Sequence, residues 1–337
     1  MRVNVFDYEL PEDLISQKPI IPRDSCRLMI IDKNKKFFTH DVFWNIKNYL
    51  NRTDLIVLND SRVIPARLLG NKSTGARVEA VLLKKISDRD WKAIVKPGNK
   101  IKTGNTLIFS NLTCKVVKHY NDGTRLLHFL DDNSDEKIFE TGRLPIPPYI
   151  KEYPKQPEYY QTVYAKKNGS VAAPTAGLHF TKRVLTELKN KGVSIAYLTL
   201  HVGLGTFRPV KASRIEDHKM HSEYYCIDAD CAQLVNKTLS NNGRVIAVGT
   251  TVVRALESNY IKHGRIIPDC DETDIFIYPP FKFNVISGMV TNFHLPKSTL
   301  LMLVSAYAGK ETTMKAYREA IYMRYKFFSF GDSCLFI

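Results

Sequence analysis

The sequence lacks the long apolar runs and the export signal that membrane and secreted proteins carry. No stretch approaches 18 uninterrupted apolar residues, the length at which a transmembrane helix is expected. The opening stretch, Met1 to Ile15, has acidic side chains where a signal peptide would have an apolar run. We therefore expect a cytoplasmic protein that does not enter the membrane.

Cysteine is scarce, and the spacing of the cysteines does not indicate a disulfide framework. The chain has six cysteines in 337 residues, at positions 26, 114, 226, 231, 270 and 334. This pattern favours reduced thiols over a disulfide-stapled fold. One array of metal-ligand type is present, and its spacing matches no standard zinc site: His218, His221, Cys226 and Cys231. We expect no bound metal.

Two common enzyme motifs are also missing. No Gly-x-Ser-x-Gly occurs, which argues against a hydrolase built on a strained nucleophile turn. The segment His201-Val-Gly-Leu-Gly-Thr206 follows a predicted strand, as a dinucleotide fingerprint would. Phe207-Arg208-Pro209 replaces the third glycine, however, and Pro209 obstructs the helix that should follow. A dinucleotide enzyme or a common-fold methyltransferase is disfavoured.

Basic residues are abundant and evenly spread. The chain has a formal net charge of +15, without a basic tail. The positive electrostatic field of such a chain favours a polyanionic partner, and nucleic acid is the leading candidate. A soluble basic protein without such a partner is the plainer alternative.

The periodicity predicts two domains. Short stretches separated by turn residues between 77 and 130, with a hairpin signal at 121–124, indicate a small all-β domain. The rest alternates buried strands with helices, two of them capped by Thr181 and Asp228 and another starting at Lys297-Ser298. The predicted fold is α/β, with a mixed-sheet main domain (1–66 and 150–337) that has helices on its faces. It carries an inserted β-barrel-like domain (67–149).

The sequence also predicts several individual loops, strands and helix ends. The acidic run at 131–136 is expected to be a solvated loop, and 274–278 a strand. The segment 285–295 is expected to be a hairpin around Gly288, and Gly243 to end the helix that Asp228 caps. The last helix is expected over 311–326, with Lys315, Arg318, Arg324 and Lys326 on its polar sides.

Polar loops follow the predicted strands or begin the helices, at 59–67, 174–179, 201–208, 218–223, 249–257 and 291–298. Ligands of open α/β sheets bind outside the carboxyl ends of the strands. These loops offer histidines, carboxylates, hydroxyls and arginines without a metal, a set that suits proton transfer on a polar ligand.

The same loops resemble the S-adenosylmethionine:tRNA ribosyltransferase-isomerases of queuosine synthesis. The resemblance spans nearly the whole chain, and its motifs are long, ordered and specific. They include NDSRVIPARL (59–68), LPIPPYI (144–150), VAAPTAGLHFT (171–181), TLHVGLGTFRPV (199–210), HKMHSE (218–223), VIAVGTTVVRALES (245–258) and TNFHLPKSTLLMLVSA (291–306). Leu204, Val252 and Cys26 depart from the family pattern, but none of them removes a charged or histidine side chain.

The resemblance implies a reaction. Family members transfer the ribosyl part of S-adenosylmethionine to 7-aminomethyl-7-deazaguanine at the tRNA wobble position and isomerise it. They yield epoxyqueuosine and release adenine and methionine. It implies S-adenosylmethionine as co-substrate, tRNA as partner, and a monomer. The alternatives are an S-adenosylmethionine-dependent tRNA methyltransferase and a non-enzymatic tRNA-binding module.

The resemblance and the loops together name the candidate residues. The general base is expected among His179, His201, His221 and His294, with Glu223 or Glu257 as its partner. Thr250, Thr251 and Arg254 are expected to bind the methionine carboxylate, and Arg62 and Arg67 to hold tRNA phosphates. The remaining substrate-binding candidates are Asn59, Asp60, Thr175, Gly177, Gly203, Gly205, Thr206, Arg208, Gly249, Asp274, Lys297 and Ser298.

Overall fold

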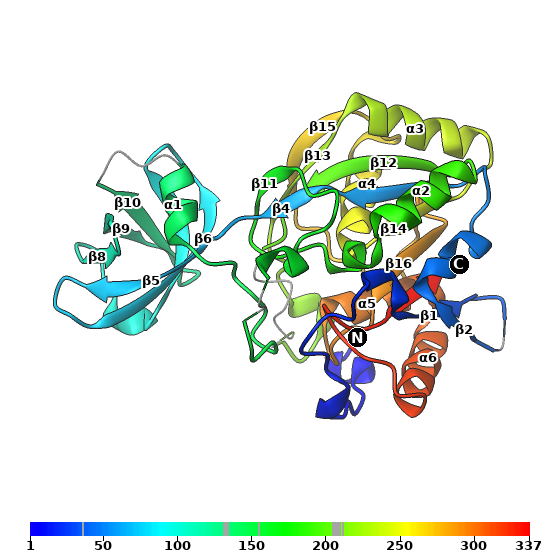
Figure 1. Cartoon of the computed structure of the whole chain (residues 1–337), viewed down its shortest axis with the longest axis horizontal. Coiled ribbons are helices and arrows are strands. Elements are labelled where there is room, and N and C mark those ends of the chain that lie inside the picture. The colour runs from blue at the N-terminus through cyan, green and yellow to red at the C-terminus, as the bar shows by residue number, and fades with distance from the viewer. Residues whose placement is uncertain (36, 131–134, 154–155, 204–209, 211) are drawn as a thin grey trace. The chain divides into compact units, whose positions relative to one another are not determined.

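The computed structural model describes residues 1–35, 37–130, 135–153, 156–203, 210 and 212–337 (Figure 1). The chain divides into two compact units. The larger unit comprises residues 1–62, 148–167 and 173–337, and the smaller comprises 63–147 and 168–172. The predicted fold class is confirmed, since one unit holds a large mixed sheet with helices and the other a closed barrel.

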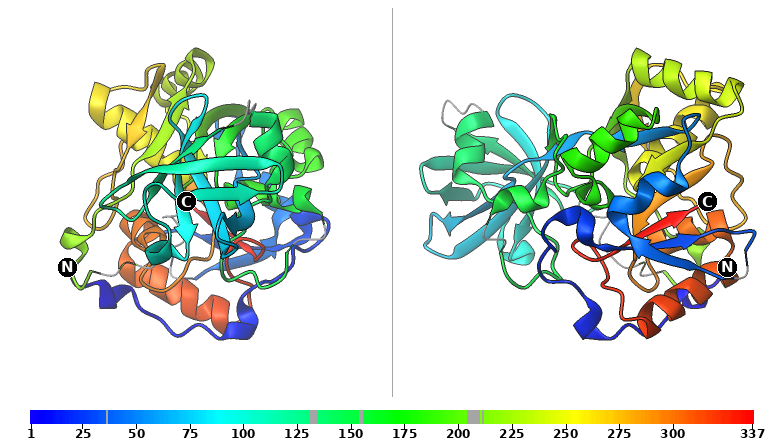
Figure 2. Two further views of the ribbon diagram at one scale, coloured as in Figure 1. Left: turned by 90° about the vertical axis from the view of Figure 1, so that its left-hand side faces the viewer. Right: turned by 45° about the vertical axis from the view of Figure 1, so that its right-hand side comes forward.

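A nine-stranded mixed sheet forms the larger unit, in the order β15-β13-β12-β3-β14-β16-β17-β1-β2. Its centre is parallel: β12 (Ser194–Leu200), β3 (Leu55–Asn59), β14 (Val245–Val248) and β16 (Gly288–Asn292). One flank contains β17 (Ser333–Phe336), antiparallel to β16, then β1 (Arg27–Ile31) and β2 (Thr39–Val42). Figure 2 shows β17, in red, beside β1, in blue. The other flank contains antiparallel β13 (Glu223–Ile227) and β15 (Asp269–Thr273).

The helices of this unit are α2 (Lys182–Asn190), α3 (Ala229–Ser240), α4 (Thr250–His263), α5 (Thr299–Ala308) and α6 (Lys310–Tyr322). Short 3-10 helices span Val3–Phe6, Glu12–Leu14, Arg23–Ser25, Phe43–Tyr49, Pro157–Tyr160, Thr175–His179 and Ile215–Asp217. Two predicted N-caps are confirmed, because the side chains of Thr181 and Asp228 accept backbone N–H bonds at 3.3 and 2.8 Å. Ser298, predicted to start a helix, also caps it by accepting a backbone N–H bond at 3.2 Å. No helix among the described residues is long and apolar enough to cross a bilayer.

A core of apolar side chains lies between α2, the 3-10 helix Phe43–Tyr49 and the sheet. Alternate residues of β3, Ile56 and Leu58, point into this core and contact fully buried side chains from both helices. The period of two explains this arrangement, because successive side chains of a strand point to opposite faces. The buried strands thereby fix the place where their carboxyl ends meet.

The smaller unit is a closed six-stranded antiparallel barrel in the order β10-β7-β6-β5-β8-β9. The strands are β5 (Arg67–Lys72), β6 (Arg77–Lys85), β7 (Asp90–Lys96), β8 (Thr106–Phe109), β9 (Leu112–His119) and β10 (Arg125–Phe129). This unit also contains a 3-10 helix (Gly98–Lys100) and α1 (Asp135–Thr141). Separately, β4 (Ser61–Val63) and β11 (Lys167–Ser170) form a two-stranded sheet.

The predicted helix end at Gly243 is confirmed, because α3 ends at Ser240 and the Gly243 N–H donates to the Thr238 carbonyl at 2.8 Å. Three local predictions are wrong. Asp135 and Glu136 begin α1 rather than lying in a loop, while 131–134 are outside the described residues. Residues 274–278 form no strand; β15 ends at Thr273, whose hydroxyl accepts the backbone N–H of Ile275 at 3.2 Å. The last helix ends at Tyr322, so Arg324 and Lys326 lie beyond it.

The predicted hairpin around Gly288 is also wrong. Gly288 begins the central strand β16, between β14 and β17. A Cβ at this position would lie 2.9 Å from the Phe336 carbonyl oxygen and 2.8 Å from the Ile246 side chain. The glycine therefore permits a close approach of neighbouring strands and does not mark a turn.

The expectation that all thiols are reduced needs a correction. Cys226 of β13 and Cys270 of β15 are directly paired in the antiparallel register and are joined by a disulfide. Their sequence separation of 44 residues gave no signal of this pairing. The other four cysteines are free and buried.

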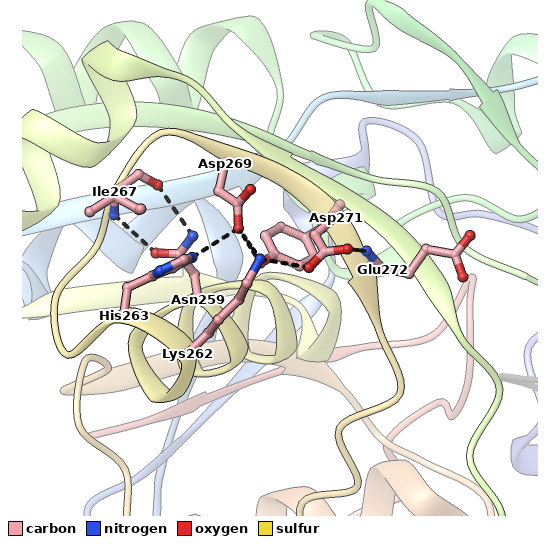
Figure 3. A network of polar contacts seen from close by, with 8 residues as sticks. Asn259, Lys262, His263, Ile267, Asp269, Asp271 and Glu272 are labelled. Carbon is pink, nitrogen blue, oxygen red and sulfur yellow. Dashed lines mark hydrogen bonds and ion pairs between the residues drawn. The ribbon is translucent and has the colours of Figure 1, made fainter.

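Polar contacts tie the carboxyl end of α4 to the edge strand β15 (Figure 3). Lys262 Nζ lies 3.0 Å from Asp269 and 2.7 Å from Asp271, and His263 Nε2 lies 3.0 Å from Asp269. The Asn259 side chain exchanges two hydrogen bonds with the Ile267 backbone. These contacts hold α4 in place, and the helix begins at the edge of the sheet where the parallel strands end.

Candidate active site

A pocket lies at the carboxyl ends of the central parallel strands, where the fold class predicts a ligand site. Its empty space measures about 630 Å³, counting space open to solvent. Val202 follows β12, Gly249 to Thr251 follow β14, and Thr291 to Leu295 end and follow β16. The other lining residues are Tyr149, Ala173 to Ala176, Ser298, Leu300, Phe328 and Ser329.

The pocket lining combines apolar side chains with uncharged polar ones and bears no formal charge among the described residues. Among the described residues that line it there is no aspartate, glutamate, lysine or arginine. Its polar groups are hydroxyls, one amide, one imidazole and the Tyr149 phenol, whose pKa is raised by burial. Such a lining suits a ligand portion that is neutral or zwitterionic.

The amino end of α4 faces this pocket. Gly249 precedes the helix with φ +89°, a conformation that side-chain-bearing residues rarely adopt. Thr250 and Thr251 then form the first turn and are buried in the pocket wall. The unpaired N–H groups of a helix start carry a partial positive charge, so this wall is suited to an anion such as a carboxylate.

The loops at 174–179 and 249–257 approach each other closely. A Cβ built on Gly249 would lie 3.7 Å from the Cβ of Ala176. Asn59, at the end of β3, joins the arrangement, because its amide donates to the Leu200 carbonyl at 2.9 Å and to the Thr251 hydroxyl at 3.4 Å. The segments 173–176 and 249–251 therefore belong to one site.

Of the four candidate histidines, His294 lines this pocket. Its Nε2 lies 2.9 Å from the Thr291 hydroxyl, and its backbone N–H donates to the Tyr317 hydroxyl at 3.0 Å. Burial lowers its pKa from 6.5 to about 3. The imidazole is therefore neutral at physiological pH.

His179 is fully buried behind the pocket wall. Its Nδ1 lies 3.1 Å from Cys26 Sγ and its Nε2 lies 3.0 Å from the Asn292 amide nitrogen. Burial, with a smaller effect of the Arg23 guanidinium, holds its pKa well below the usual range. The structure places this histidine where it supports a pocket residue without lining the pocket itself.

The other two histidines lie elsewhere. The His201 ring stacks on Tyr224 with ring centres 5.5 Å apart, and burial lowers its pKa. His221 lines a second, smaller pocket together with Glu223 and Arg254. The two pockets share Leu300, so they adjoin.

Glu223 and Arg254 form a close ion pair, and both are almost fully buried. Glu223 also accepts the backbone N–H of Gly203 at 2.8 Å. Arg254 donates to the carbonyls of Thr273 and Ile275, at 3.2 Å each. The pair thereby connects α4 with the glycine loop after β12 and with the end of β15.

Glu257 has a different environment from the one the sequence suggested. Its two carboxylate oxygens accept backbone N–H groups from three successive residues at 2.9, 3.0 and 3.2 Å: Asn284, Val285 and Ile286. The side chain is fully buried. These contacts hold the segment before β16, and no histidine is among the described partners of Glu257.

We predict that Glu257→Gln weakens the fold rather than the chemistry. An amide nitrogen facing backbone N–H groups leaves at least one of them unpaired, so the free energy of unfolding should fall by about 2–3 kcal/mol. Urea denaturation would measure this, with exposed Glu9→Gln as the control. Unchanged stability with lost turnover would instead indicate a catalytic carboxylate.

Several substrate-binding candidates serve structural contacts. Asp60 accepts from the Thr199 hydroxyl at 2.7 Å, and burial raises its pKa. A Cβ at Gly177 would lie 2.1 Å from the Tyr164 hydroxyl, so this glycine is needed for packing. Lys297 pairs with Asp7 at 2.7 Å.

The remaining candidates are distributed as follows. Thr175 and Ser298 line the main pocket. Arg62 pairs with Glu158 at 3.3 Å, and Asp274 is exposed. Arg67 lies in the barrel unit and pairs with Glu79 at 3.1 Å. Gly205, Thr206 and Arg208 lie outside the described residues.

Sequence reasoning did not name four polar lining residues as candidates: Tyr149, Thr291, Asn292 and Ser329. Tyr149 lies in the motif LPIPPYI, and Thr291 with Asn292 lies in TNFHLP. Those motifs were the available signal. The mistaken hairpin around Gly288 hid the fact that 291 and 292 end a central strand.

The buried histidines predict acid sensitivity. Below pH 6.5 the unfolded chain binds protons on these imidazoles while the folded chain does not, so stability falls as pH falls. Between pH 6 and 4 each histidine should lower the free energy of unfolding by up to about 1.4 kcal/mol per pH unit. Urea denaturation of wild type and His294→Gln across this range would measure it. A variant with the same pH slope as wild type would contradict the burial argument.

The chain is similar to a known family over its whole length. Residues 3–336 match the family model described as queuosine biosynthesis protein. A curated relative from Thermosipho africanus, named S-adenosylmethionine:tRNA ribosyltransferase-isomerase, is 52% identical over 341 residues and covers 99% of both chains. A relative of the same name from Halothermothrix orenii is 52% identical and covers 100% of both. A crystal structure of S-adenosylmethionine tRNA ribosyltransferase from Thermotoga maritima is 39% identical with a TM-score of 0.57, covering 99% of this chain and 100% of that one.

Proposed function

The chain belongs to the S-adenosylmethionine:tRNA ribosyltransferase-isomerase family of queuosine biosynthesis, and we propose that it performs the full reaction implied by that membership. It transfers the ribosyl moiety of S-adenosylmethionine to 7-aminomethyl-7-deazaguanine at the tRNA wobble position and isomerises it. The products are epoxyqueuosine-tRNA, adenine and methionine. The pocket at the carboxyl edge of the sheet is the reaction site.

The observation that carries this proposal is the composition of that pocket. Three of the motifs shared with the family supply its walls, namely those containing Thr175, Thr250 and Asn292. The lining is uncharged among the described residues, and the start of α4 offers N–H groups to an anion. The amino acid portion of S-adenosylmethionine is a zwitterion, so its carboxylate suits the wall formed by Thr250 and Thr251.

We assign proton abstraction to His294. The sulfonium group acidifies the adjacent 5′ carbon of the ribose, and a base must remove a proton there. His294 lines the pocket as a neutral imidazole beside the Thr291 hydroxyl. Departing adenine needs a proton, and the imidazolium formed at His294 can supply it. His294 would then serve as base and later as acid.

The tRNA is expected to contact basic side chains, with Arg62 and Arg67 as candidates for phosphate binding. Both are partly exposed and make surface ion pairs, which contribute little and are easily exchanged for a phosphate. The net charge of +15 supplies the long-range attraction. Affinity for tRNA should accordingly fall as salt rises.

Product analysis tests this function. The protein is incubated with S-adenosylmethionine and a tRNA bearing 7-aminomethyl-7-deazaguanine, and the nucleosides and small molecules are identified by mass spectrometry. Epoxyqueuosine with free adenine and methionine is the expected result. S-adenosylhomocysteine with a methylated nucleoside would indicate a methyltransferase, and unchanged tRNA that still binds would indicate a binding module.

A further inference from the structure

We propose that Asn292 and Thr175 form a pair of hydrogen-bond acceptors that binds the α-ammonium group of S-adenosylmethionine. This inference rests on the proposed function and adds a specificity-determining role to two residues of the pocket. It follows from the orientation of one buried amide, which its neighbours fix completely.

The Asn292 amide can point only one way. Its Nδ2 lies 3.0 Å from the backbone carbonyl oxygen of Phe328. A carbonyl oxygen accepts and never donates, so the atom facing it must be the NH₂ group and not the amide oxygen. The second hydrogen of the same NH₂ group is directed to His179 Nε2, also at 3.0 Å. Both amide hydrogens are therefore committed to the protein.

His179 is the residue that holds this orientation. Since its Nε2 accepts from Asn292, that nitrogen is unprotonated, and the ring proton of the neutral imidazole is on Nδ1. Nδ1–H can then donate to Cys26 Sγ at 3.1 Å. The Arg23 guanidinium, whose Nη2 lies 3.4 Å from the same Nδ1, only donates and is therefore not a hydrogen-bond partner of Nδ1 in this tautomer. His179 is fully buried and does not line the pocket. It acts as a positioning residue for Asn292.

Asn292 and Thr175 therefore present hydrogen-bond acceptors to the pocket. Asn292 Oδ1 accepts from the Thr175 hydroxyl at 3.3 Å and retains a second lone pair. Because the Thr175 hydrogen is committed to Asn292, its hydroxyl oxygen is also left as an acceptor. Both residues line the pocket. Two adjacent acceptors match a group that only donates, and an ammonium group is such a group.

The strand register places these acceptors beside the start of α4. Val248 of β14 is paired with Val290 of the parallel strand β16, and the Gly249 N–H donates to the Val290 carbonyl at 2.8 Å. Two residues beyond this pair, Thr250 begins α4 and Asn292 ends β16, and both line the pocket. An α-amino acid presents a carboxylate and an ammonium on one carbon. The helix start suits the first and the acceptor pair suits the second.

A binding comparison tests the inference. Calorimetry would measure the affinity of the full chain for S-adenosylmethionine and for an analogue in which hydrogen replaces the α-ammonium group. Wild type should prefer S-adenosylmethionine by roughly 10- to 100-fold, as expected for hydrogen bonds to a charged group. Asn292→Ala should lose most of this preference. The exposed Asn190→Ala should retain it.

Thr175→Val gives a second variant that keeps the side-chain shape, and it should lower the preference by roughly 3- to 10-fold. The preference is a ratio, so a general loss of folded protein affects both ligands and leaves the ratio unchanged. Variants that keep the wild-type preference would overturn the inference while leaving the proposed function standing. Wild type that binds neither ligand would count against the proposed function itself.

Discussion

His294→Ala is expected to lower turnover about 100- to 10,000-fold, the usual contribution of a positioned general base. His294 is the candidate histidine that lines the pocket, and its neutral imidazole lies 2.9 Å from the Thr291 hydroxyl. Adenine released from S-adenosylmethionine in the presence of the substrate tRNA measures the rate. Affinity for S-adenosylmethionine should change far less than the rate.

Two further histidine variants sharpen this prediction. His119→Ala removes an exposed imidazole from the barrel and should leave the rate at saturating tRNA nearly unchanged. His221→Ala removes the histidine of the second, smaller pocket. If the His221 variant loses activity and the His294 variant does not, the base lies in the second pocket and our assignment is wrong.

Arg254→Met is expected to destabilise the larger unit by about 3–5 kcal/mol, the usual effect of leaving one member of a buried ion pair without its partner. Glu223 would then be a buried carboxylate that lacks the guanidinium. Urea denaturation measures the loss. The double variant Glu223→Gln/Arg254→Met should recover part of it, because no unpaired charge remains.

This ion pair also supports the pocket. Glu223 holds the Gly203 N–H, and the neighbouring residue Val202 lines the main pocket. The double variant should therefore regain stability without regaining full affinity for S-adenosylmethionine. If Arg254→Met is as stable as wild type but fails to bind S-adenosylmethionine, Arg254 contacts the ligand directly, as the sequence alone suggested.

The fold was largely predictable because its signals are local. Alternation of apolar residues located five barrel strands, and the caps at Thr181 and Asp228, with the predicted start at Ser298, located three helix starts. β5 escaped because Arg67 to Lys72 lacks a clear alternation, with a glycine and an asparagine in its second half. Gly288 misled because a glycine required for close strand contact looks the same in sequence as a glycine in a turn.

The site was predictable only in part, because burial and partners depend on contacts between distant segments. The strand-end loops contain Thr175, Gly249, Thr250, Thr251, His294 and Ser298, which all line the pocket. The sequence could not show that His294 lines the pocket while His179 is buried behind its wall. The burial of His179 depends on contacts with distant residues, and its partner Asn292 lies 113 residues away in the sequence. Nor could the sequence show that Glu257 binds three backbone amides.

A crystal structure of the protein with bound S-adenosylmethionine would test the account most directly. We predict that the methionine carboxylate lies at the start of α4 beside Thr250 and Thr251, with the ammonium group at Asn292 and Thr175. The ribose 5′ carbon should then lie within reach of His294. A ligand bound instead in the second pocket, between His221 and Arg254, would contradict the account.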